Sequence, residues 1–419
     1  MSSGGGVSLW ELGSLVSALR VRRRSPAEVE RRALLGVESF LRYCREHVPY
    51  YADYPDAPLT GLPVLSKPVV LAAGPERFHG PVTAFTVDRT SGTTGRAIEV
   101  RHDRRAYGYH GATIVRRFLA TGYRPWWPIT QLKPFARPTR WFQRLGVFPR
   151  TVVRATLPDE EVARAVLAAR PRVLMGYPLV LRTLLRTLGP ERAALLRPRL
   201  RVVMTDSELL TPEARTLLAR GFGVPVFDEY SAYEVLTISS DCALGAAHVD
   251  LDRVWVEVTD ADGRPVPVGE EGDVVVTHYR ERAMPLVRYS VGDRGALLPG
   301  RCRCGSPLPR MRLTTGRTGD HVVLLSGRVL GAALFLRAGA YTPGLAECMV
   351  RQDDAGLITA HLVLEPGAEF APVAADFASQ VAGSLDGTPL RVVPADRVEL
   401  TAAGKGRFLA SDYRPRPDA

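Results

Sequence analysis

The stretch Thr90-Ser91-Gly92-Thr93-Thr94-Gly95-Arg96 follows directly after an apolar segment, Val82–Val87, that we expect to form a strand. Its glycines let backbone amides approach a phosphate closely, and its hydroxyl side chains add hydrogen-bond donors. The composition therefore predicts a phosphate-binding loop, with a flexible polar turn as the alternative. The P-loop pattern is excluded, because its lysine and the spacing of that lysine are absent.

Apolar segments and helix-forming segments alternate on both sides of this loop. The apolar spacing of Pro26–Cys44 predicts a helix with Ser25 as its cap and Pro26 at its first position. Further helices are expected at Asp103–Ala120, Asp159–Ala169, Leu179–Leu188 and Pro212–Arg220, the last closed by Gly221, and strands at Val173–Met175 and Leu200–Met204. Such alternation predicts parallel sheets covered by helices.

The pattern changes past residue 250. Short strands are expected at Val254–Val258 and Val274–Tyr279 around the turn-rich Asp260–Gly272, which indicates antiparallel structure. After Gly316 we expect strands at Val322–Leu325 and Leu357–Leu364 and a helix at Ala371–Gly383, enough for a small domain. We predict an α/β protein whose large N-terminal domain, residues 1–316, has parallel sheets covered by helices plus a β-rich subdomain, followed by a small α+β C-terminal domain, residues 317–419.

Composition narrows the class of protein. The 419 residues are 46% apolar and 24% charged, which is ordinary for a globular enzyme of more than one domain. No apolar run reaches the roughly 20 residues of a membrane-spanning helix, and Met1–Trp10 lacks the layout of a secretory signal, so we expect a cytoplasmic protein with no membrane partner. The formal charge is +11, but the basic residues are spread along the chain, and the one dense run, Arg20–Arg24, is typical of a solvated face. No nucleic-acid partner is expected. The sequence leaves open whether the chain forms a homodimer.

Lysine is scarce in this chain. Of the 55 basic residues only Lys67, Lys133 and Lys405 are lysines. Arginine serves wherever a generic positive charge suffices, whereas lysine presents a compact ammonium as a point charge. The three lysines are therefore candidates for chemistry, with base composition as the alternative explanation.

Four further segments follow the loop in order, namely Asp228-Glu229-Tyr230-Ser231-Ala232-Tyr233-Glu234, Pro285-Leu286-Val287-Arg288-Tyr289-Ser290-Val291-Gly292-Asp293, Gly316-Arg317-Thr318-Gly319-Asp320 and Gly404-Lys405-Gly406-Arg407. Together with the loop they resemble the motifs of the adenylate-forming acyl-CoA synthetases, in the compact branch typified by phenylacetate-CoA ligase. Five motifs in fixed order are far more specific than any one of them.

The resemblance implies a role for each motif. The residues that would bind ATP or AMP are Thr90, Ser91, Gly92, Thr93, Thr94, Gly95, Ser207, Glu208, Asp228, Tyr230, Ser231, Asp293 and Arg317. Among them Tyr230 would stack on adenine, Asp293 would hold the ribose hydroxyls, and Arg317 would lie near ribose and phosphate. Glu234 would hold Mg²⁺. Lys405 would reach the acid and the α-phosphate from a mobile C-terminal lid that rotates between two half-reactions.

These residue types suit the implied chemistry. Attack of a carboxylate on the α-phosphate brings two anions together, so the site must supply cations and donors. Mg²⁺ at Glu234, the loop amides and Lys405 would supply them.

Four positions depart from the family pattern. Ser231 replaces the usual glycine and Tyr233 the usual serine or threonine, so the acid pocket is bulkier at two positions. Gly319 stands where a polar hinge residue is common, and Arg96 takes the usual lysine position after the loop. The nucleotide motifs are intact, whereas the identity of the acid and of the acceptor stays open.

Four residues have the chemistry of a zinc site, namely Cys242, His248, Cys302 and Cys304. Three thiolates and one imidazole form a closed ligand set for a structural Zn²⁺. The two halves lie about 60 residues apart, so spacing does not establish that they meet. Similar Cys and His positions occur in some members of the phenylacetate-CoA ligase branch. The alternative to a zinc site is a set of free thiols. The odd total of five cysteines fits a reducing compartment.

Other candidates are less specific. His102, His110 and His321 are candidates for proton transfer, although an isolated histidine is more often structural. Trp126, Trp127 and Phe135 would line an aryl pocket or pack in a core. Lys133 would face an anionic group of the substrate, in a pocket that also contains Ser231 and Tyr233.

The leading interpretation is an AMP-forming ligase that uses ATP and Mg²⁺ to adenylate a small, aromatic carboxylic acid and passes the acyl group to CoA or another acceptor. The first alternative is an ATP-dependent diazotase, which adenylates nitrite and transfers it to an aryl amine, because Ser231 and Tyr233 leave less room for an acid. The second is a non-catalytic ATP-binding protein. The complete set of Glu234, Asp293, Arg317 and Lys405 argues against this second alternative.

Overall fold

The computed structural model describes residues 9–89, 98–133, 141–155, 157, 159–315, 321–326, 329–331, 335, 338–339, 342–397, 409–411 and 413. The chain forms two compact units, and it passes between them repeatedly. Unit 1 comprises residues 1–127, 139–149 and 227–313. Unit 2 comprises residues 128–138, 150–226 and 314–419.

Helices of unit 1 lie mainly in its N-terminal part. They are α1 (Leu9–Arg20), α2 (Pro26–His47), α3 (Lys67–Ala73), α4 (Arg104–Ala120) and α5 (Trp141–Arg144). In α2 the buried residues recur every three or four positions from Val29 to Cys44, so one apolar face points into the core. The Ser25 hydroxyl accepts a hydrogen bond from the Glu28 amide at 3.2 Å, which confirms the predicted cap.

Unit 1 contains a predominantly antiparallel sheet. Its strands are β7 (Val226–Ala232), β8 (Leu236–Asp241), β9 (Ala247–Val249), β10 (Trp255–Thr259), β11 (Gly272–Thr277), β12 (Tyr289–Leu298) and β13 (Arg310–Thr315), in the order β10-β11-β12-β13-β9-β8-β7. Residues of α2 and of these strands share one hydrophobic core. A separate ladder pairs β1 (Ala84–Arg89) with β2 (Glu99–Asp103) in antiparallel fashion.

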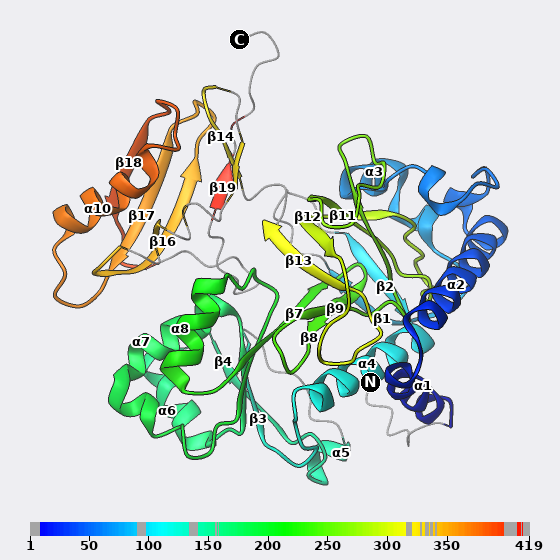
Figure 1. Cartoon of the computed structure of the whole chain (residues 1–419), viewed down its shortest axis with the longest axis horizontal. Coiled ribbons are helices and arrows are strands. Elements are labelled where there is room, and N and C mark those ends of the chain that lie inside the picture. Colours follow the sequence, from blue (N-terminus) through cyan, green and yellow to red (C-terminus); the bar gives the residue numbers. More distant parts are fainter. Residues whose placement is uncertain are drawn as a thin grey trace. The chain divides into compact units, whose positions relative to one another are not determined.

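The first part of unit 2 is a parallel sheet with helices. Its strands β3 (Ile129–Lys133), β4 (Arg150–Arg154), β5 (Val173–Gly176) and β6 (Val202–Asp206) have the order β6-β5-β3-β4. Figure 1 shows α6 (Asp159–Ala169), α7 (Pro178–Ala194) and α8 (Pro212–Phe222) gathered beside this sheet. Their apolar residues and those of the strands form one buried cluster, as expected for a parallel sheet.

The C-terminal part of unit 2 has its own sheet and core. The strands β16 (Leu345–Gln352), β17 (Ile358–Leu364), β18 (Leu390–Pro394) and β19 (Leu409–Ser411) have the order β18-β17-β16-β19, and β14 (His321–Val323) pairs with β15 (Val329–Gly331). The helix α10 (Phe370–Ala382) buries Val373, Phe377 and Val381 against this sheet (Figure 1).

Most predicted elements are confirmed, but the pairing of β1 and the ends of α2, α7 and α8 differ from expectation, and α2 continues past Cys44 to His47. The strand predicted at Val82–Val87 exists as β1, but it belongs to an antiparallel pair and not to a parallel sheet. The helix predicted to close at Gly221 continues to Phe222 and ends at Gly223, whose φ of 71° is the left-handed conformation that glycine adopts without strain. The helix α7 runs beyond Leu188, across a break at Gly189, to Ala194.

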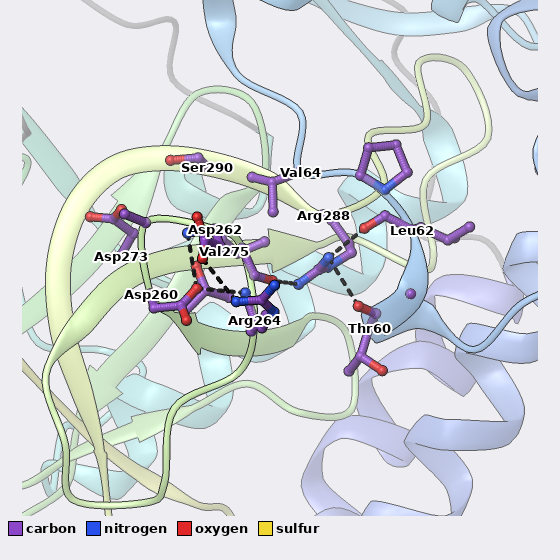
Figure 2. Close-up of a pocket in the computed structure, with 15 residues that line it drawn as sticks. Thr60, Leu62, Val64, Asp260, Asp262, Arg264, Asp273, Val275, Arg288 and Ser290 are labelled. Atoms are coloured by element: carbon purple, nitrogen blue, oxygen red, sulfur yellow. Dashed lines mark hydrogen bonds and ion pairs between the residues drawn. The ribbon is translucent and has the colours of Figure 1, made fainter.

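Arg288 connects the N-terminal segment of unit 1 to its sheet (Figure 2). Its guanidinium pairs with Glu257 at 3.0 Å and donates to the carbonyl oxygens of Thr60, Leu62 and Gly263. The side chain lies beside a cavity of about 550 Å³ between residues 60–64 and strands β10 to β12. Because the guanidinium donates four hydrogen bonds and pairs with Glu257, this buried arginine holds the walls together instead of facing a ligand.

Among the helices of the described residues, none has the length and apolar character needed to cross a membrane.

Candidate active site

Two tyrosines orient the predicted nucleotide-site carboxylates of unit 1. The Tyr230 hydroxyl on β7 donates to Asp293 Oδ2 at 2.7 Å. The Tyr289 hydroxyl on β12 donates to Glu234 Oε1 at 2.9 Å. The structure therefore brings together the motif at residues 228–234 and the motif at residues 285–293, which are distant in the sequence.

A bulge in β12 places Asp293. Ser290 is opposite Val275 and Arg294 is opposite Asp273, so residues 291–293 oppose a single residue of β11. Within the bulge Gly292 has a φ of 81°, a conformation that side chains beyond glycine rarely adopt. Bulges re-aim side chains next to functional sites, and this one turns Asp293 toward Tyr230.

Glu229 stands between Asp228 and Tyr230 in the sequence, and its side chain belongs to a buried polar network. Its carboxylate forms an ion pair with Arg117 of α4 and accepts from the Thr237 hydroxyl at 2.5 Å. His110 Nε2 lies 2.8 Å from that hydroxyl, whose proton is already donated to Glu229, so Nε2 donates. Burial lowers the pKa of His110 well below its usual value, and Arg253 and Arg117 add to the shift, so the ring is neutral. His110 therefore fixes β7 and β8 to α4.

The carboxyl edge of the parallel sheet in unit 2 has a second polar cluster. Lys133, the last residue of β3, forms an ion pair with Asp206, the last residue of β6, at 2.6 Å. Its ammonium also lies 4.3 Å from the ring centroid of Tyr177, which follows β5. Ligands of open α/β sheets bind at this edge. Ser207 follows directly with a φ of 68°, and the Glu208 amide donates to the Asp206 carbonyl at 2.9 Å. The ammonium of Lys133 is thus already paired with a protein carboxylate.

The four predicted zinc ligands meet in unit 1. One ligand atom from each of Cys242, His248, Cys302 and Cys304 lies within 4.8 Å of the others. Cys242 Sγ and Cys302 Sγ are 3.9 Å apart, and Cys304 Sγ is 3.4 Å from His248 Nε2. A tetrahedral zinc with Zn–S bonds of about 2.3 Å separates two sulfurs by about 3.8 Å, so the observed spacing fits.

The second nitrogen of His248 has the arrangement expected for a metal ligand. Nδ1 donates to the Leu308 carbonyl at 2.9 Å, which leaves the lone pair of Nε2 directed at the thiols. Burial lowers the pKa of His248, so the neutral, coordinating form of the ring is favoured. Cys242 directly follows β8 and His248 lies on β9, and the segment between β12 and β13 supplies the other two ligands.

The remaining predicted residues have varied positions. Thr90 to Arg96, Phe135, Arg317, Gly319 and Lys405 lie outside the described residues. Asp228 lies on β7 and its amide donates to Asp241 Oδ2 at 2.8 Å, and Ser231 pairs across the hairpin with Thr237. Trp126 is largely exposed, Trp127 packs edge-on against Tyr123, and His321 begins β14.

Sequence reasoning gave no role to Tyr289, Glu281 or Arg253. Tyr289 could have been found, because it lies within residues 285–293, a segment that the sequence had already singled out. Glu281 and Arg253 lie outside every motif, and only the tertiary structure reveals their contacts.

The chain is similar in sequence to known phenylacetate-coenzyme A ligases. The chain is 26% identical over 317 residues to the phenylacetate-coenzyme A ligase of Thermus thermophilus, covering 69% of this chain and 70% of that protein. It is 24% identical over 329 residues to the phenylacetate-coenzyme A ligase of Aromatoleum evansii, covering 73% and 74%. No family model matches the chain.

Solved structures share the fold. A 2-hydroxyisobutyryl-CoA ligase in the postadenylation state, in complex with an acyl-AMP, superposes with a TM-score of 0.78 at 17% identity, covering 94% of this chain and 91% of that chain. An anthranilate CoA ligase in complex with anthranoyl-AMP gives a TM-score of 0.57 at 16% identity, covering 76% and 65%. The resemblance and the fold class predicted from the sequence are confirmed.

Proposed function

We propose that the chain is an AMP-forming acid–CoA ligase, which adenylates a small carboxylic acid with ATP and then transfers the acyl group to CoA. The observation that supports this most directly is the pairing of Tyr230 with Asp293 and of Tyr289 with Glu234. Two carboxylates fixed by hydroxyl donors suit a nucleotide with its metal. The ribose hydroxyls need a hydrogen-bond acceptor, the metal needs an oxygen ligand, and both must be held in a fixed direction. The similarity to two phenylacetate-coenzyme A ligases over about 70% of the chain points to the same chemistry.

In this proposal the side chains of unit 1 hold the nucleotide. Asp293 accepts hydrogen bonds from the ribose hydroxyls, and the Tyr230 ring lies against the adenine while its hydroxyl keeps Asp293 in place. Glu234 is the protein ligand of Mg²⁺, which supplies positive charge to the phosphates. Lys405 and the loop at residues 90–96, which lie outside the described residues, provide the remaining cation and donors at the α-phosphate. The proposal keeps the predicted boundary between residues 316 and 317, with Lys405 in the C-terminal domain.

Substrate class and setting belong to the same proposal. An aromatic acid is favoured because phenylacetate is the acid in the names of the relatives found at 24–26% identity. The cluster of Cys242, His248, Cys302 and Cys304 holds a structural Zn²⁺ that fixes the segment between β12 and β13 to the β8–β9 hairpin. A reducing, cytoplasmic setting fits five cysteines that form no disulfide, all of them among the described residues.

The test is AMP and pyrophosphate release from ATP and Mg²⁺ across a panel of aryl and short-chain acids, with and without CoA. We expect release that depends on one acid and an acyl-CoA product of the corresponding mass. Release that requires nitrite and an aryl amine, and no carboxylate, would establish a diazotase instead. ATP binding with no AMP from any panel member would contradict an enzymatic function.

A pair of lysine variants separates the half-reactions. Lys405→Ala is expected to slow adenylation by about 10²–10³-fold, the loss typical when one charge-stabilising group is removed. Transfer from a synthetic acyl-adenylate to CoA should change far less, since Lys405 serves the first half-reaction. Lys67→Ala, at the start of α3, is the matched control and should leave both rates unchanged.

A further inference from the structure

Glu234 lies in the turn of a tight hairpin. Ala232 at the end of β7 pairs with Leu236 at the start of β8, so only residues 233–235 form the turn. Leu236 has a φ of 62°, the left-handed region that a leucine rarely adopts. Backbone strain of this kind persists only where surrounding groups hold it in place.

Two fully buried side chains bind the carbonyl groups on either side of Glu234. His102 Nε2 donates to the Tyr233 carbonyl at 2.9 Å. Arg253 Nη1 donates to the Val235 carbonyl at 2.8 Å. Both side chains are 0% exposed, so water does not compete for these bonds. Together with the Tyr289 hydroxyl on the carboxylate, they fix Glu234 at its backbone and at its side chain.

His102 is itself anchored to a rigid support. Its Nδ1 lies 2.9 Å from Glu281 Oε2, while Glu281 Oε1 accepts from the backbone amides of Asp103, Arg282 and Ala283 at 2.8–3.0 Å. Each nitrogen of His102 thus has one buried partner, the Glu281 carboxyl group or the Tyr233 carbonyl. The assembly is a chain of buried hydrogen bonds that connects the loop containing Glu281 to the turn.

The same cluster has the composition of a metal site, since His102, His278 and Glu281 offer ligand atoms within 4.8 Å of one another. The positive charge of Arg253 beside the cluster argues against that use. Both nitrogens of His102 are occupied, and the Arg253 guanidinium donates to His278 Nε2 at 3.1 Å, where a metal would have to lie beside a positive charge. The cluster therefore holds the turn at residues 233–235 in place.

We propose that His102 and Arg253 are positioning residues that set the location of the Glu234 carboxylate by holding the carbonyls of Tyr233 and Val235. The inference rests on the proposed function, in which Glu234 binds the magnesium of Mg·ATP. Groups that orient a metal ligand typically account for about 10- to 100-fold in metal affinity or activity, and a functional group must be placed to within about 0.5 Å. Neither residue touches the nucleotide in this arrangement.

Two substitutions at His102 separate its two hydrogen bonds. The amide nitrogen of asparagine falls close to the Nδ1 position of histidine, and that of glutamine falls close to the Nε2 position. His102→Asn keeps the bond to Glu281 and loses the bond to the Tyr233 carbonyl, whereas His102→Gln does the reverse. We expect the asparagine variant to need about 10- to 100-fold more Mg²⁺ for half-maximal AMP release, with an unchanged KM for the acid. The glutamine variant should stay within about threefold of the wild type.

A control variant at Tyr43 and a second variant at Arg253 complete the test of the positioning role. Tyr43→Phe removes a 3.0 Å bond to the Arg282 carbonyl in the same region without touching the turn, and its Mg²⁺ dependence should equal that of the wild type. Arg253→Lys tests the other carbonyl and should raise the Mg²⁺ requirement as His102→Asn does. Thermal protection by ATP with Mg²⁺, compared with ATP and EDTA, gives a readout besides turnover, and it should fall in His102→Asn alone among the His102 variants.

The outcomes are distinguishable. Equal Mg²⁺ dependence of the two His102 variants, in an active protein, overturns the positioning role and leaves the proposed function intact. A wild-type protein that forms no AMP with any acid and gains no thermal protection from Mg·ATP overturns the proposed function, and the inference with it.

Discussion

Replacing Arg288 by methionine should strongly destabilise unit 1. The guanidinium is 2% exposed and forms the ion pair with Glu257, while three backbone carbonyls depend on it for hydrogen bonds. Methionine keeps much of the aliphatic volume and removes every one of these donors. Glu257 would then be left as a buried carboxylate without its counter-ion.

The magnitude follows from that loss. Removing one partner of a buried ion pair costs about 3–5 kcal/mol, because the remaining charge is uncompensated. For a unit of this size about 1 kcal/mol corresponds to a shift in Tm of roughly 2–4 °C, so we expect Tm to fall by roughly 6–20 °C. Arg264→Met is the matched control. Arg264 lines the same cavity, but its ion pair with Asp262 is 76% and 69% exposed, so the change should stay within about 0.5 kcal/mol.

Both variants can be compared by thermal and urea unfolding followed by circular dichroism. If Arg288→Met unfolds at the same temperature as Arg264→Met, the connection between residues 60–62 and the sheet contributes nothing to stability, and the reasoning from burial is refuted.

Three further predictions concern the site and its surroundings. Tyr230→Phe removes the 2.7 Å hydrogen bond to Asp293, a charge-assisted bond of about 1.5 kcal/mol. KM for ATP should therefore rise about tenfold, with little change in KM for the acid. An unchanged KM for ATP would contradict the role of Asp293. Burial raises the pKa of Asp252, but Arg116 outweighs it and lowers the pKa to about 2, so the stability that this carboxylate adds is present above pH 4 and is lost as pH falls toward 2. As pH falls from 5 to 2, the urea midpoints of the wild type and Asp252→Asn should therefore converge. Parallel curves would contradict the lowered pKa of Asp252. One zinc per chain is expected by elemental analysis of the wild type and should be lost in Cys304→Ser, whereas equal metal content in the two proteins would count against the four-ligand site.

Local signals predicted local structure well. The first and last residues of α6 match the sequence expectation, and Ser25 caps α2, because caps and apolar spacing act within a few residues. The end of α8 was placed two residues early, since two glycines were available and only backbone geometry selects Gly223. Strand partners were harder, because alternation along the chain does not distinguish the antiparallel β1–β2 pair from a strand of a parallel sheet.

The candidate site shows the same division. Motif residues were identifiable because their spacing is local, and the structure adds that Tyr230 meets Asp293 and that the cysteines meet His248. The supports of Glu234 were not predictable, since His102 and Tyr233 are separated by 131 residues and Arg253 belongs to no motif. Such contacts depend on tertiary packing, which neither propensity nor composition encodes.

The interleaving of the two units has a consequence for synthesis on the ribosome. The face of α2 that carries Phe40 and Tyr43 contacts Arg282, a partner made more than 200 residues after His47. At about 5–20 residues per second this interval is on the order of 10–50 s. The strands and helices of the parallel sheet, β3 to β6 with α6 to α8, are all made by residue 222 and can close first. This part of α2 is therefore covered late, and its apolar face is the surface that a chaperone would meet on the nascent chain.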